Sequence, residues 1–125
     1  MSEIRATTIS DAAGTGPVTL TKQSAAKSYV HFNGTGTVAI QDSLNVSSIT
    51  DDGTGQYDIN FSTNFANTNY TSLIGNYNQS SNTDFGTTMG YGGVYTAAQV
   101  SIAHFESGSL TDTARMFSAQ HGDLA

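Results

Sequence analysis

Apolar and polar residues alternate most clearly in residues 43–61, SLNVSSITDDGTGQYDINF. Leu44 and Val46 alternate with polar residues before the sequence DDGTG, and a second alternating series, YDINF, follows it. A period of two on both sides of a glycine-containing turn predicts an antiparallel β-hairpin with one apolar face. The apolar positions fall out of step just before the turn, which predicts a β-bulge there. Because a hairpin cannot bury its apolar face alone, a second sheet or a neighbouring subunit must cover it.

A second hairpin is predicted in residues 28–40, SYVHFNGTGTVAI. Val30 and Phe32 precede the turn NGTG, and Val38 and Ile40 follow it with the same spacing. Such apolar pairs stabilise two strands when they lie opposite each other on one face. We therefore expect these two runs to form neighbouring antiparallel strands.

Three further strands are predicted in the second half of the chain. Residues 70–75 contain TSLIG, which is apolar on both faces and predicts a strand that is covered on both sides. Residues 98–105 and 114–121 alternate, and in the latter Phe117 and Ala119 share a face. With the two hairpins, these strands predict an all-β, antiparallel, β-sandwich-like domain over residues 28–125.

Residues 1–27 are expected to form an extended N-terminal arm or stem that serves attachment or subunit contacts. Residues 3–10 predict a short strand with poorly distinguished faces, and the only proline, Pro17, follows. The sequence GTG occurs at Gly14, Gly34 and Gly53, each time before a similar apolar pattern. A short solenoid repeat is one interpretation. We favour one turn type reused three times, in which these glycines are backbone positions without chemistry.

The composition narrows the possible partners. Only 11% of residues are charged and the net charge is -6, with four scattered basic residues, so no basic patch exists to bind nucleic acid. No apolar run approaches the roughly 18 residues of a membrane helix, and MSEIRATT lacks the apolar core of a signal peptide. We expect no insertion into a membrane. We expect the chain to be made and folded in a cytoplasm. Cysteine is absent, which excludes disulfides and thiolate metal sites.

Metal sites and cofactors are not expected. Asp51, Asp52 and Asp58 surround the central turn, but their spacing does not match an EF-hand calcium loop, and aspartate is common in turns for its own backbone hydrogen bonds. No two of the three histidines are spaced as a metal pair within one strand. In a trimer, one histidine from each subunit could still meet on the three-fold axis, and this alternative stays open.

Catalysis has little support in the sequence. Motifs for a nucleophilic serine, a zinc protease or a phosphate-binding loop are missing. We therefore expect no enzyme. The alternative is a small glycan-degrading enzyme in which Asp84 and Glu106 act as the carboxylate pair.

Residues 76–95, NYNQSSNTDFGTTMGYGGVY, combine glycines and small polar residues with four aromatic side chains. Aromatic faces and neighbouring amides or hydroxyls bind sugars, and the same composition suits protein recognition. The candidate receptor- or glycan-binding residues are Tyr77, Phe85, Tyr91 and Tyr95. The alternative is a glycine-rich hairpin whose tyrosines cover the sheet.

Residues 27–61, KSYVHFNGTGTVAIQDSLNVSSITDDGTGQYDINF, resemble a block found in tail-fibre and fibre-like virion proteins of tailed bacteriophages, particularly phages of marine bacteria. The opening EIRATTISDAAG and the closing GDLA are similar to the same group. The resemblance implies a homotrimeric β-structured appendage whose variable loops touch the host surface.

From this resemblance we expect a non-enzymatic virion structural protein, a short tail-fibre or fibre-like appendage used in host attachment and receptor recognition. Its partners are expected to be two further copies of itself, other virion or tail proteins, and a glycan or protein of the host cell surface. It is expected on the virion, at the tail or as an external appendage. The alternatives are a carbohydrate-binding module and a purely structural decoration or adaptor protein.

Overall fold

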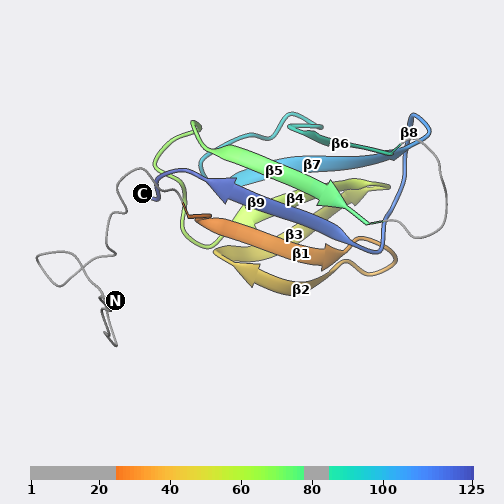
Figure 1. The fold of residues 1–125 in the computed structure, drawn as a ribbon, viewed down its shortest axis with the longest axis horizontal. Coiled ribbons are helices and arrows are strands. Elements are labelled where there is room, and N and C mark those ends of the chain that lie inside the picture. The colour runs from red at the N-terminus through yellow and green to blue at the C-terminus, as the bar shows by residue number, and fades with distance from the viewer. Residues whose placement is uncertain (1–24, 78–84) are drawn as a thin grey trace, which may run out of the picture.

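The computed structural model describes residues 25–77 and 85–125, and within them the chain forms strands and no helix (Figure 1). The strands are β1 (Ser28–Asn33), β2 (Ala39–Leu44), β3 (Val46–Gly53), β4 (Gln56–Phe61), β5 (Thr71–Asn76), β6 (Phe85–Met89), β7 (Gln99–Glu106), β8 (Ser109–Leu110) and β9 (Met116–His121). The strand predicted at residues 3–10, the GTG copy at Gly14 and nearly all of the predicted arm lie outside the described residues.

The strands form two antiparallel sheets that pack face to face. One sheet has the order β2-β1-β9-β5, and the other has the order β3-β4-β7-β6 with β8 paired to β7. Figure 1 shows the first sheet in front of the second. The prediction of an all-β, antiparallel sandwich is therefore confirmed.

Both predicted hairpins are present. β1 pairs with β2, and β3 pairs with β4 through a turn that follows an irregularity of register between Asp51 and Gly53, where the bulge was expected. Leu44 does not belong to the β3–β4 hairpin, because it ends β2 in the other sheet. The chain changes sheet at Asn45, which has φ 55 and exchanges two side-chain hydrogen bonds with the backbone of Thr63, at 2.7 and 3.0 Å.

The core is built largely from aromatic side chains between the sheets. Phe32 of β1 and Tyr57 of β4 meet edge to face, with ring centroids 5.1 Å apart. A second aromatic group, Phe61, Phe65 and Tyr70, closes one end of the sandwich. Such pairs prefer these offset and T-shaped arrangements. The other buried apolar residues are Val30, Ile59, Val100, Ile102, Ala103 and Met116.

The glycine-containing turns are fixed by close backbone contacts. The Tyr57 hydroxyl donates a hydrogen bond of 2.9 Å to the carbonyl of Gly34, and a Cβ at Gly34 would overlap this hydroxyl. Gly55 donates its N–H to the Asp112 carboxylate at 2.7 Å. The copies of GTG at residues 34–36 and 53–55 precede β2 and β4, which lie in different sheets, so the solenoid interpretation is wrong for the described copies.

We predict a much larger loss of stability for Gly55→Ala than for Gly36→Ala. Both glycines have positive φ, +67° and +64°, but a Cβ at Gly55 would lie 2.7 Å from the carbonyl oxygen of His104, whereas nothing lies within 4 Å at Gly36. At Gly36 the backbone conformation alone is expected to lower the free energy of unfolding by about 1 kcal/mol. At Gly55 the added clash with the backbone is expected to lower it by at least about 3 kcal/mol. Urea unfolding of both variants measures the difference, and equal losses would contradict the clash.

Candidate functional site

The four aromatic residues predicted to bind a receptor are not brought together. Tyr77 follows β5, is 47% exposed, and has the guanidinium carbon of Arg115 5.4 Å from its ring centroid. Tyr95 stacks on Tyr70, 4.8 Å between centroids, and donates its hydroxyl proton to the Tyr70 carbonyl. Because Tyr70 precedes β5 and Tyr77 follows it, the length of the strand separates them, about 20 Å at ~3.3 Å per residue.

Tyr91 and Phe85 belong to the other sheet. Tyr91 follows β6, is 39% exposed, and meets Phe105 edge to face at 5.4 Å. Phe85 begins β6, where its backbone pairs with Glu106. Tyr95 thus packs at the end of the sandwich. For this residue, the packing agrees with the alternative interpretation, in which the tyrosines of residues 76–95 cover the sheet. A recognition role for Tyr77, Phe85 and Tyr91 stays a prediction.

A different surface has the character of a binding site, namely the outer face of the β2-β1-β9-β5 sheet. Side chains alternate along a strand, so the strand register identifies which ones point away from the core. Two rows cross the sheet on this outer face: Leu44, Tyr29, Ala119 and Leu73 in one, and Asp42, His31, Phe117 and Gly75 in the other.

The first row is apolar and open to solvent. Leu44, Tyr29 and Leu73 are 48%, 37% and 61% exposed, and Phe117 in the second row is 38% exposed. The prediction that Phe117 and Ala119 share a face is confirmed, but that face points outward. The prediction that β5 is covered on both sides is wrong for the single chain, because β5 is an edge strand with Leu73 uncovered.

The inner face of the same sheet carries polar residues at the matching positions. Ser28, Gln120 and Ser72 lie in one row across β1, β9 and β5. Ser28 Oγ, Ser72 Oγ and Gln120 Oε1 are buried without a hydrogen-bond partner among the described residues. Burying such atoms is unfavourable by about 1–3 kcal/mol each. At this one row the sheet therefore buries polar atoms, while the neighbouring outward row exposes apolar side chains; the other inward residues, such as Val30, Phe32 and Met116, belong to the apolar core.

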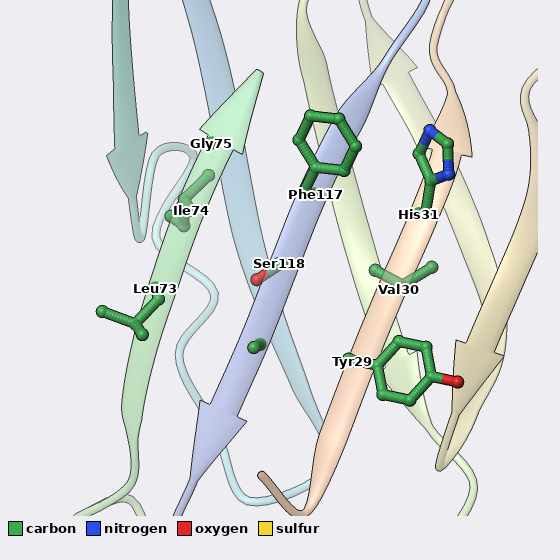
Figure 2. A pocket seen from close by; sticks show the side chains of 9 residues that line it. Tyr29, Val30, His31, Leu73, Ile74, Gly75, Phe117 and Ser118 are labelled. Atoms are coloured by element: carbon green, nitrogen blue, oxygen red, sulfur yellow. The ribbon is translucent and has the colours of Figure 1, made fainter. Parts of the chain in front are cut away.

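A shallow hollow of about 420 Å³ lies in the outer face, above its small residues. Figure 2 shows Leu73 on β5, Phe117 on β9, and His31 and Tyr29 on β1 around it. The His31 imidazole stacks on the Phe117 ring with centroids 4.7 Å apart.

The hollow is suited to an apolar partner. Its lining contains no carboxylate, ammonium or guanidinium group. The Tyr29 hydroxyl points toward Asp42 at the rim, 3.4 Å from the carboxylate oxygen. A sugar needs several polar partners for its hydroxyls, and such partners are few here. The surface fits the apolar side chains of a protein better than it fits a glycan.

The aspartates of the central turn are held by the protein itself. Asp58 accepts hydrogen bonds from Ser101 Oγ at 2.5 Å and Gln99 Nε2 at 2.6 Å. Partial burial raises the pKa of Asp52, and the charge and hydrogen bond of neighbouring Asp58 raise it further. Over residues 25–77 and 85–125, no three His, Cys, Asp or Glu side chains gather as a metal site.

The histidines occupy two different environments. His31 on β1 and His121 on β9 belong to the outer face, whereas His104 on β7 is fully buried, and burial lowers its pKa. Of the carboxylate pair in the enzyme alternative, Glu106 ends β7 and Asp84 lies outside the described residues.

Comparisons of the chain with models of protein families, with curated proteins and with solved structures find no match. Within the described part of the chain, no helix has the length and apolar character needed to cross a membrane.

We predict that Asp52→Asn stabilises the protein at neutral pH. A carboxyl group with a raised pKa in the folded state contributes stability when protonated, and this is lost as pH rises through the folded-state pKa. Removing the charge is expected to raise the free energy of unfolding by about 0.5 kcal/mol near neutral pH, a value limited by solvent screening. Below the ordinary aspartate pKa of 3.8 the substitution is expected to change the free energy of unfolding little. Urea unfolding at neutral pH and at a pH below the ordinary aspartate pKa tests this, with Asp123→Asn as control. An equal effect at both pH values would contradict the assignment.

We also predict that Tyr95→Ala and Tyr91→Ala differ in stability. Tyr95→Ala removes the stacking on Tyr70 and is expected to cost about 3 kcal/mol, whereas Tyr91→Ala, at an exposed turn, is expected to cost less than about 1 kcal/mol. Thermal unfolding followed by circular dichroism measures both. A Tyr95→Ala variant as stable as the parent protein would show that Tyr95 is free for binding.

Proposed function

We propose that the chain is a non-enzymatic structural protein of a bacteriophage virion, a short tail-fibre or fibre-like appendage that assembles as a homotrimer and serves in host attachment. The support for the phage assignment is the resemblance of residues 27–61, which span β1 to β4 and the turns between them. This block contains both hairpins of the sandwich and the change of sheet at Asn45.

The observation that carries the proposal is the apolar outer face of the β2-β1-β9-β5 sheet. Contiguous apolar patches of this kind mark surfaces that bind other proteins or assemble. The face is built on regular strands, and its hollow lacks a cluster of acid and base groups. These features suit a subunit that packs against other subunits more than they suit a catalyst.

On the virion, the protein would be an external component that has folded and assembled in the host cytoplasm. Its other partners are neighbouring virion or tail proteins and a glycan or protein of the host surface. Tyr77 and Tyr91, both exposed, remain candidates for such a contact.

A carbohydrate-binding module is the weaker alternative. Tyr77 and Tyr95 lie at opposite ends of β5, and Tyr95 is held by Tyr70, so these two aromatics do not form one sugar platform. A decoration or adaptor protein differs from the leading proposal only in lacking receptor contact.

Two measurements test the proposal. Light scattering of the purified full-length protein is expected to give three times the chain mass of 13.1 kDa.

Antibodies against the protein are expected to label the exterior of virions of the phage that encodes it and to slow the adsorption of these virions to host cells, with pre-immune serum as control. Virions in which mass spectrometry detects no copy of the chain would contradict the virion assignment. Labelling without slower adsorption would favour the decoration or adaptor alternative.

A further inference from the structure

We infer that the outer face of the β2-β1-β9-β5 sheet is the surface through which copies of this chain pack against one another. The large side chains of one copy enter the hollow above Ala119 and Gly75 of the next. The number of copies in the assembly, which is three, rests on the proposed function. The choice of surface rests only on the geometry and charge of the sheet.

The first reason is the row of apolar side chains that this sheet points into water. Its inner face already carries a packed core together with the buried polar residues Ser28 and Gln120. Tyr29, Phe117 and Leu73 nevertheless point outward and are exposed. An outward apolar face becomes favourable when a second surface removes it from water.

The second reason is charge, which favours a copy of the same chain as the partner. The chain carries a net charge of -6, so two copies repel each other over most orientations. The lining of the hollow contains no carboxylate, and Asp42, at its rim on the edge strand β2, is exposed and lies 3.4 Å from the Tyr29 hydroxyl. This neutral face is where two acidic copies approach at low electrostatic cost.

The third reason is shape. Across the first row, the large residues Leu44, Tyr29 and Leu73 flank the small Ala119, and Gly75 ends the second row beside Phe117. Projections and a hollow thus occur on the same surface. In a closed ring of three, the projections of each copy enter the hollow of the next, so each contact joins two different parts of this surface. A surface with both parts can complement itself.

The exposed apolar area is adequate for the centre of such an interface. Leu44, Tyr29, Leu73 and Phe117 are between 37% and 61% exposed. With side chains of about 150–250 Å² each, they present on the order of 350 Å² of apolar surface. A stable interface buries about 800 Å² per partner, of which a little over half is apolar and the rest is a polar rim. The four side chains therefore supply most of the apolar part.

The test compares three variants of the full-length protein by sedimentation velocity at micromolar concentration. Leu73→Asp places a charge on the exposed edge of the face. Gly75→Leu adds apolar surface but fills the hollow, and the backbone accommodates it because a Cβ there would lie 3.8 Å from Phe117. Tyr91→Asp is the control, because Tyr91 is as exposed as Phe117 but lies in the turn after β6 of the other sheet.

We expect both Leu73→Asp and Gly75→Leu to weaken association at least about tenfold, or ~1.4 kcal/mol, and Tyr91→Asp to leave it unchanged. Circular dichroism and thermal unfolding establish that each variant is folded. Tighter association of Gly75→Leu would overturn the inference, because it would mean that the face is only adhesive.

The remaining outcomes separate this inference from the proposed trimer. A trimer that both face variants leave intact would overturn the choice of surface and leave the proposed function standing. A dimer that both variants dissociate would support the surface and contradict the trimer. A parent protein that stays monomeric at high concentration would overturn both.

Discussion

The side chain of Tyr57 is the contact on which the arrangement of the two sheets depends. It extends from β4 to meet Phe32 of β1, and its hydroxyl donates to the carbonyl of Gly34 in the turn before β2. The same hydroxyl lies 3.2 Å from the carboxylate of Asp112, which also accepts the N–H of Gly55. Burial, followed by the charge of Asp112, raises the pKa of Tyr57 above its usual range, so the phenol stays protonated and keeps donating. One side chain thereby fixes two turns and the spacing of the sheets.

Once Tyr57 holds Phe32 inside, the period of two determines the rest of the β2-β1-β9-β5 sheet. Tyr29 and His31 must point outward, and the register of β1 with β9 carries Phe117 and Ala119 to the same side. Ser118 and Gln120 then point inward, where Gln120 donates to Ser118 at 2.6 Å. Which positions face outward is thus a consequence of how the core is anchored. Exchanging the two faces would move the aromatic contact that joins the sheets.

The sequence predicted what is local and missed what depends on contacts between distant segments. The two hairpins follow from alternation and glycine turns, so both were found, with the bulge near Asp51. Alternation with a period of two predicts that Phe117 and Ala119 share a face, but it does not predict which face of the sheet the core covers. Phe65 and Tyr70 lie in a loop without periodicity, and only tertiary packing shows that they are buried. One feature of the sequence could have indicated the change of sheet at Asn45. Asparagine tolerates the positive φ found there more readily than most residues do.

The two faces of the sandwich suggest a division between assembly and recognition. If copies associate through the outer face of β2-β1-β9-β5, the sheet β3-β4-β7-β6 is left facing outward from the assembly. Val100 and Ile102 of β7 point into the core, so Phe105 lies on the opposite, outer side, and Tyr91 packs against it there. The same side carries Asp58, which accepts hydrogen bonds from Ser101 and Gln99 and is largely buried with Ser101. Under the proposed function, the exposed Tyr91 and the apolar face would serve different partners.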